Sequence, residues 1–257
     1  MPIEGDPPGP IAGVLADMRD RLEVLPPELS SQRAFLETYR RTTLAVTKAI
    51  ADGAFEDPDW VEAWDAAFAQ LYLDALDARL SGGRVPRPWR LAFEAPTSLP
   101  PLRHVLLGIN AHINYDLPQA LLAVIPDEDF ADATVLARRQ RDHERIDGVL
   151  SGRVAAEDAE LSAVSARTLL DRALQPVNRL ASRRFLREAR LKVWHNTREL
   201  QHARVAGPLP YAARLAELEV LSAARLADLT APGQVLLRLA VAGFGVLLPP
   251  ADRGQYG

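Results

Sequence analysis

The sequence predicts an all-α protein, a single orthogonal multi-helix domain built around a buried central helix at about residues 102–117. Apolar residues recur at intervals of three and four in nearly every segment, which is the period of a helix with one buried face. No window alternates apolar and polar residues over several strands, and no repeat of fixed length is visible. Proline and glycine pairs separate the periodic segments, and such pairs open or end helices.

Four helices are predicted before the central one. The second of them takes Ser30 or Ser31 as its N-cap, because a serine hydroxyl can bond the unpaired backbone N–H groups of the first turn. The third opens at Asp57-Pro58, with proline in the first turn, and ends at Gly82-Gly83. These helices cover residues 11–22, 30–51, 58–81 and 89–93.

The second half is also predicted to be helical. Pro118 should break or kink the central helix just after Asp116, because its ring clashes with the preceding turn. An acidic loop at 127–132 leads into a charged helix that contains RRQRDHERIDGVL, and further helices are expected at 156–174, 177–204, 211–229 and 233–247. The predicted domain covers 11–250, with a loose N-terminal arm at 1–10 and a tail at 251–257.

Composition excludes several classes of protein. The chain has 257 residues, of which 48% are hydrophobic and 25% charged, and this balance is typical of a soluble globular protein. A net charge of −4 argues against a nucleic-acid binder that works through a basic surface. The absence of cysteine rules out disulfides and thiolate ligands and fits a reducing cytoplasm. No apolar run is long enough to span a membrane, and no signal peptide is visible.

The central helix carries the strongest functional signal. The stretch 102–124 is mainly apolar, yet it holds Asn110, His112, Asn114 and Asp116 within seven residues. Burying such groups without partners costs about 1–3 kcal/mol each. His112 and Asp116 are four residues apart and therefore project from the same helix face. That spacing suits two metal ligands, or a carboxylate that orients an imidazole.

A second pair has the same spacing. His195 and Glu199 lie on a predicted helix beside Trp194, and the two pairs together could form one nitrogen and oxygen site for a divalent metal, with zinc as the first choice. A bound water in an open position would then supply a nucleophile. The residues expected to contact the substrate are Asn110, Asn114, His143 and Trp194.

Each of these patterns also has a purely structural interpretation. The central polar residues could be a satisfied buried network that fixes helix packing. His195 and Glu199 could be an exposed helix pair, and His143 could lie on a solvated charged face. Trp60, Trp64 and Trp89 are most simply core aromatics.

Two resemblances follow from these motifs. LLGINAHINYDLP with its flanking helices resembles an uncharacterised helical family common in actinobacteria. More distantly, Leu107-Gly108, His112-x-x-x-Asp116 and Pro118 are similar to the core helix of zinc-dependent phospholipase C and single-strand nucleases. This second resemblance implies that His112, Asp116, His195 and Glu199 are zinc ligands in an all-α phosphoesterase. The chain departs from that family in lacking its histidine after the proline and its N-terminal tryptophan ligand.

Three classes of function stay open at this point. The first is a metal-dependent hydrolase of a phosphoester, with a metal-bound water as nucleophile. The second is a metal-free enzyme with His112 as general base and Asp116 orienting it. The third is a helical protein that binds a lipid or isoprenoid-like small molecule and grips its polar head group. The sequence does not determine the oligomeric state.

Overall fold

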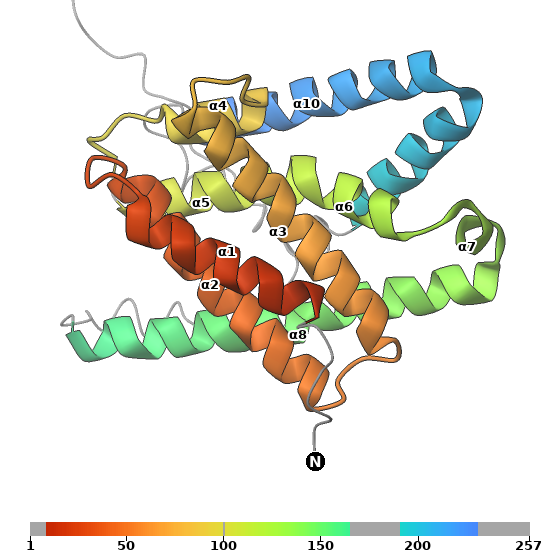
Figure 1. The fold of residues 1–257 in the computed structure, drawn as a ribbon, viewed down its shortest axis with the longest axis horizontal. Coiled ribbons are helices and arrows are strands. Elements are labelled where there is room, and N and C mark those ends of the chain that lie inside the picture. Colours follow the sequence, from red (N-terminus) through yellow and green to blue (C-terminus); the bar gives the residue numbers. More distant parts are fainter. Residues whose placement is uncertain (1–8, 100, 165–190, 231–257) are drawn as a thin grey trace, which may run out of the picture.

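The computed structural model describes residues 9–99, 101–164 and 191–230, and within these ranges the chain is helical with no strand (Figure 1). The prediction of an all-α fold in a single domain is confirmed. The helices are α1 (Pro10–Val24), α2 (Ser30–Ala51), α3 (Pro58–Leu80), α4 (Arg87–Phe93), α5 (Pro101–Ala111), η1 (His112–Asp116), α6 (Leu117–Val124), α7 (Asp127–Ala131), α8 (Ala133–Val164), a helix at 191–206, and α10 (Pro208–Thr230).

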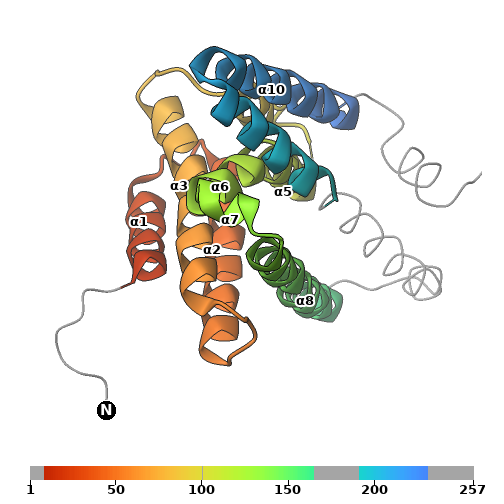
Figure 2. The same ribbon diagram turned by 90° about the vertical axis from the view of Figure 1, so that its right-hand side faces the viewer.

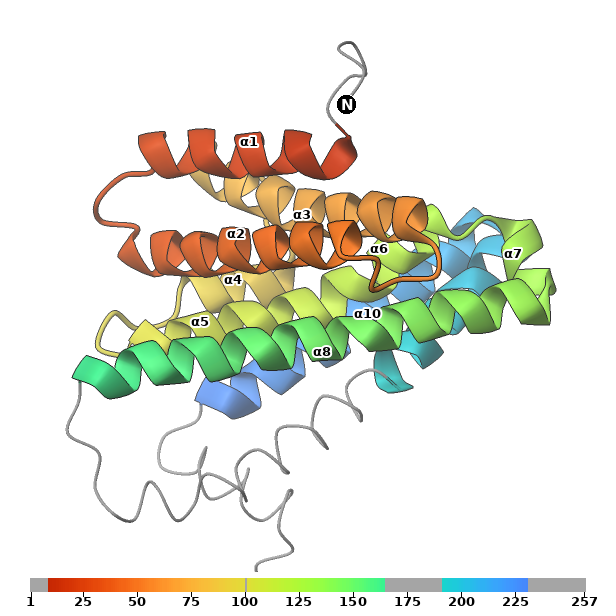
Figure 3. The same ribbon diagram turned by 90° about the horizontal axis from the view of Figure 1, so that it is seen from below.

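The helices form two sets that cross at a steep angle. Helices α1, α2 and α3 lie side by side, and α5, α6, α8 and α10 run across them (Figures 1 and 2). Seen from below, α8 runs along the outside of the molecule with the continuous helix α5–η1–α6 behind it (Figure 3). The continuous helix packs against α2 and α3 on one side and against α10 on the other. The predicted buried central helix is therefore confirmed.

The close contact between α5 and α2 depends on a glycine. A Cβ atom placed on Gly108 would lie 2.4 Å from Cδ2 of Phe35, which is closer than any real contact. Helices approach this closely only where a residue without a side chain faces the neighbouring helix. Gly108 is buried, and Leu107 beside it belongs to the same apolar cluster as Phe35.

The bounds of α3 follow from local chemistry that the sequence displays. The Asp57 carboxylate accepts a hydrogen bond from the Trp60 N–H at 3.1 Å and caps the first turn. At the other end Gly82 has φ +72°, where glycine is strongly favoured. The prediction of a serine cap for α2 was wrong, because Leu29 occupies the N-cap position and no side chain bonds the first turn.

Two further predictions are corrected by the structure. Residues 127–131 form the short helix α7 rather than a loop, since three acidic side chains in its first turn favour a helix N-terminus. Helix α8 also runs unbroken through residue 156, where a separate helix was expected to begin. No proline interrupts that stretch, and glycines weaken a helix without ending it. Residues 165–174 and 177–190 of the helices predicted at 156–174 and 177–204, the whole helix predicted at 233–247, residues 1–8 of the arm, and the tail lie outside the described residues.

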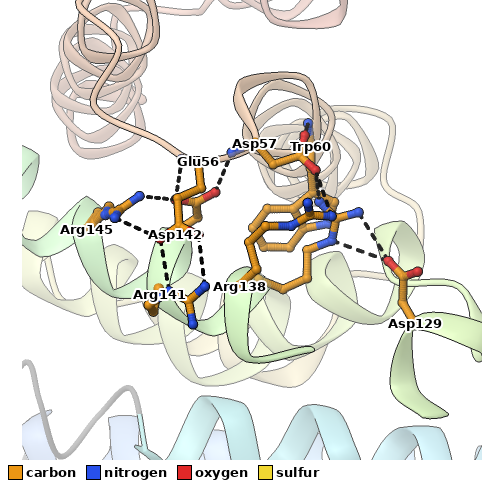
Figure 4. Close-up of polar contacts among 9 residues, drawn as sticks. Glu56, Asp57, Trp60, Asp129, Arg138, Arg141, Asp142 and Arg145 are labelled. Atoms are coloured by element: carbon orange, nitrogen blue, oxygen red, sulfur yellow. Dashed lines mark hydrogen bonds and ion pairs between the residues drawn. The ribbon is translucent and has the colours of Figure 1, made fainter. Parts of the chain in front are cut away.

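An ionic network holds α8 to the loop between α2 and α3 (Figure 4). The fully buried Asp142 carboxylate accepts hydrogen bonds from the backbone N–H groups of Glu56 and Asp57, both at 2.8 Å. The Nε and Nη2 groups of Arg141 donate hydrogen bonds to the two carboxylate oxygens of Glu56, both at 2.9 Å. This contact, opposed by some desolvation, lowers the pKa of Glu56 to about 2. Arg139 bonds Asp57 and lies 5.0 Å from the centre of the Trp60 ring.

Among the helices that the structure describes, none combines the length and the apolar content that a membrane span requires.

Candidate functional site

The polar segment of the central helix forms a widened π-helical turn. The N–H of Leu117 bonds the carbonyl of His112, five residues earlier. Pro118 has no N–H to offer the carbonyl of Asn114, so that carbonyl needs another donor. The hydroxyl of Ser222 on α10 supplies it at 3.1 Å. Of the two outcomes predicted for Pro118, a break or a kink, the break does not occur, since η1 continues directly into α6. The widened turn accommodates the proline, and such turns often mark functional sites.

His112 and Asp116 form a hydrogen-bonded dyad inside the protein. Nδ1 of His112 lies 2.8 Å from Oδ2 of Asp116, and the two residues are 4% and 2% exposed. The indole Nε1–H of Trp89 donates to the same oxygen at 2.7 Å. Neither side chain faces bulk solvent, in agreement with their place on a buried central helix. Trp89 is a core aromatic, as expected, and it also orients the carboxylate.

An aromatic shell surrounds the His112 ring. Phe68 lies flat on the imidazole, with ring centres 3.5 Å apart and an angle of 6° between the planes. Tyr39 meets it edge-on at 4.7 Å. These rings restrict the imidazole to one orientation and exclude solvent from it. The shell consists of Phe35, Tyr39, Phe68, Tyr72 and Trp89.

Burial sets the protonation of the dyad. It lowers the pKa of His112 and raises the pKa of Asp116, and the hydrogen bond between them opposes both shifts. We assign the imidazole proton to Nδ1, because an ionised carboxylate can only accept. Nε2 of His112 is then the basic atom that points away from Asp116. It is buried and has no hydrogen-bond partner among the described residues.

Nε2 is not alone in this respect. The hydroxyls of Tyr39 and Tyr72 and Oδ2 of Asp65 are also buried without a partner within the described part of the chain. Each such atom costs about 1–3 kcal/mol, and natural proteins hold few of them. We call Tyr39, Asp65, Tyr72, His112 and Asp116 the central polar cluster.

Sequence reasoning missed three members of this cluster. Tyr39 and Tyr72 lie on the apolar faces of α2 and α3, where the sequence pattern predicts core aromatics rather than site residues. A signal was present, because Asp65 is a charged residue on the apolar stripe of α3. Its spacing of three and seven from Phe68 and Tyr72 places all three on one helix face.

Asn110 and Asn114 do not join the cluster through their side-chain amides. The Asn110 amide donates to the carbonyl of Leu106, and the Asn114 amide donates to the carbonyl of Asn110, both at 2.8 Å. Both bonds run within the central helix. The prediction that these residues contact a substrate stays a prediction, without added support from the geometry.

Comparison with known proteins places this chain in a family. Residues 11–232 match DUF5995, described as a family of unknown function. The chain belongs to DUF5995. The matched range includes every residue of the central polar cluster and both histidine pairs. No curated protein and no solved structure matches the chain. The resemblance to an uncharacterised family is thereby confirmed.

The second histidine pair of this DUF5995 chain faces away from the first. Along 191–206 the buried residues include Trp194, Thr197 and Leu200, and His195 is exposed. The carboxylate of Glu199 lies 3.8 Å from the ring of another exposed histidine, His202. The helix packs against α6 through Trp194 and Leu200, so that packing does not bring His195 to the dyad.

His143 is buried rather than solvated. Its ring packs against Trp64 at 5.1 Å and stacks on Trp194 at 5.6 Å, and it is 1% exposed. The interpretation of this segment as a solvated face therefore holds for Arg141, Glu144 and Arg145 but is wrong for Asp142 and His143. In this DUF5995 chain, His143 of α8 and Trp194 of the 191–206 helix pack against each other beside α3. Both residues were predicted to contact the substrate, and that role stays a prediction.

The four predicted metal ligands do not form one ligand set. His112 and Asp116 are bonded to each other in the core, and His195 lies on the surface. Across the described ranges, which include all four, no three histidine or acidic side chains are grouped so that they could hold a metal ion. Metal-dependent hydrolysis therefore remains a prediction from the sequence of this chain, and elemental analysis of the purified chain tests it.

Proposed function

We propose that this protein binds a small molecule beside His112 and acts on it as a metal-free general base, with Asp116 holding the imidazole. One observation carries the proposal: Nδ1 of His112 is engaged by Asp116, while the buried Nε2 has no partner among the described residues. A histidine oriented in this way can take a proton from a group placed at Nε2, and the carboxylate stabilises the imidazolium that forms.

The surroundings of Nε2 indicate the kind of molecule. The aromatic shell offers apolar contact, and the hydroxyls of Tyr39 and Tyr72 can donate or accept hydrogen bonds. Mainly apolar walls with a few convergent polar atoms are typical of small-molecule sites. We therefore expect a ligand with an apolar body and one polar end. We place this function in the cytoplasm, because a chain without cysteine suits a reducing compartment.

The decisive experiment compares three forms of the chain. The unmodified protein, His112→Gln and the control His195→Gln are incubated with the small-molecule fraction of a cell extract, filtered, and analysed by mass spectrometry. His195 has the same spacing to an acidic residue but is exposed, so its variant controls for the loss of a histidine. We expect at least one compound that the unmodified chain and His195→Gln retain and His112→Gln loses.

The base role has its own measurement. The retained compound should be converted over time by the unmodified chain and much more slowly by Asp116→Asn, because the amide cannot stabilise the imidazolium in the same way. Retention without conversion would reduce the function to binding. Equal retention by all three forms, or by none, would refute the proposal.

A further inference from the structure

Helix α3 presents a buried carboxyl on the face that packs against the dyad. Phe68, which lies flat on His112, is three residues from Asp65 on the same face. Asp65 is 6% exposed, and its Oδ2 has no hydrogen-bond partner in the described part of the chain. A buried carboxyl without partners is rare and needs an explanation.

Tyr39 links this carboxyl to the dyad. Its ring lies 4.7 Å from the His112 ring and 6.0 Å from the Tyr72 ring. Burial raises the pKa of Tyr39 well above its ordinary value, and the charges of Asp65 and Asp116 raise it further. Both carboxyls are therefore near enough to act on the same phenol.

The charge balance favours an uncharged Asp65. Among the described residues, no lysine or arginine bonds either Asp65 or Asp116. Burial alone raises the pKa of Asp65 from 3.8 to about 7. A neutral carboxyl is a hydrogen-bond donor, whereas the neutral His112 ring offers an acceptor at Nε2. An anionic ligand would meet carboxyl groups without a compensating cation.

We propose that Asp65 is the second polar contact for the ligand, donating a hydrogen bond while Nε2 of His112 accepts one, so that the ligand is an uncharged alcohol on an apolar body. A single hydroxyl can accept from the carboxyl and donate to the imidazole at the same time. This inference rests on the proposed function and names its substrate class. Asp65 then holds the hydroxyl in place while His112 receives its proton.

Few other titratable groups lie close enough to Asp65 to produce the same pH dependence of binding. Helix α6 packs against α3 without a titratable side chain, and the acidic residues of α1 are exposed. On α3 itself, Tyr72 also faces this region. The neighbouring elements contribute four more titratable groups, which are Tyr39 of α2, His112 and Asp116 of η1, and His143 of α8, the last of them against Trp64.

Three probes with one apolar ring and different polar groups test the inference. Cyclohexanol, cyclohexanecarboxylate and cyclohexylamine are titrated separately, and the ¹⁵N resonances of the His112 ring report binding. We expect cyclohexanol to bind and the carboxylate to leave the ring unchanged. Because only the protonated carboxyl donates, the affinity for cyclohexanol should fall about 30-fold between pH 6 and pH 8.5 for a group that titrates near 7.

Two variants separate a ligand contact from a structural role. Asp65→Asn keeps a donor that does not titrate, so it should bind cyclohexanol with equal affinity at both pH values. Asp65→Ala should lose the binding, and its fold is checked by circular dichroism. Stronger binding of the amine at high pH, no binding of cyclohexanol, or a pH dependence that survives in Asp65→Asn would each overturn the inference. The proposed function is tested separately, by whether His112→Gln loses the compound that the unmodified chain retains.

Discussion

The buried carboxyl of Asp65 should make the protein less stable as the pH rises, and Asp65→Asn should remove this effect. Below about pH 4 the carboxyl is protonated in both folded and unfolded chains and contributes nothing to pH dependence. Between about pH 4 and pH 7 it is ionised only in the unfolded chain, because burial raises the pKa of the folded form from 3.8 to about 7. Ionisation then favours unfolding, so stability falls with increasing pH.

The size of the effect follows from the same pKa difference. Each pH unit in that window costs about 1.4 kcal/mol, and the full difference corresponds to about 4 kcal/mol above pH 7. A typical domain has a free energy of unfolding of about 5–15 kcal/mol, so the loss would be a large share of it. Asp65→Asn carries no titrating group and should lack this slope, whatever its stability at a single pH.

Urea unfolding at half-unit steps from pH 4.5 to 8, followed by circular dichroism, measures the effect directly. His112 and Asp116 also titrate with shifted pKa values, but both are present in each protein, so the difference between the two profiles isolates Asp65. Asp74→Asn, which removes an exposed carboxyl from the same helix, is the control and should follow the unmodified profile. Parallel profiles for the unmodified chain and Asp65→Asn would refute the reasoning.

Three further substitutions, the first with a matched control, test the packing around the dyad, and all are measured by urea unfolding. Gly108→Ala should destabilise by about 1–3 kcal/mol, because its Cβ would overlap the ring of Phe35; Gly148→Ala, where a Cβ meets nothing, should be neutral or stabilising by up to about 1 kcal/mol. Trp89→Phe removes a donor from the dyad carboxylate and should cost about 1.5–3 kcal/mol; no measurable cost would mean that this hydrogen bond is not formed. Ser222→Ala deprives the carbonyl beside the π-helical turn of its donor and should cost about 1 kcal/mol, and an unchanged midpoint would contradict that role.

The two histidine pairs have the same spacing, but one is buried and the other lies at the surface. His112-x-x-x-Asp116 is buried and hydrogen-bonded, whereas His195 is exposed and Glu199 lies near a surface histidine. Spacing shows only that two residues share a helix face. Whether that face meets the core or the solvent depends on which side of the helix carries the larger apolar residues, and on 191–206 those include Trp194 and Leu200.

The sequence by itself determined the fold class, the positions of most helices and the buried dyad. These features depend on local chemistry: the helical period of apolar residues, the Asp57 cap, the glycines after α3, and two polar residues one turn apart in an apolar helix. Only the tertiary structure decided which groups join the dyad. Tyr39 of α2 and Trp89 of α4 contact the dyad, and Asp65 of α3 acts on Tyr39, because of the way these three helices cross the central helix. Such contacts arise from side-chain packing between segments far apart in the chain, and no local sequence pattern encodes these contacts.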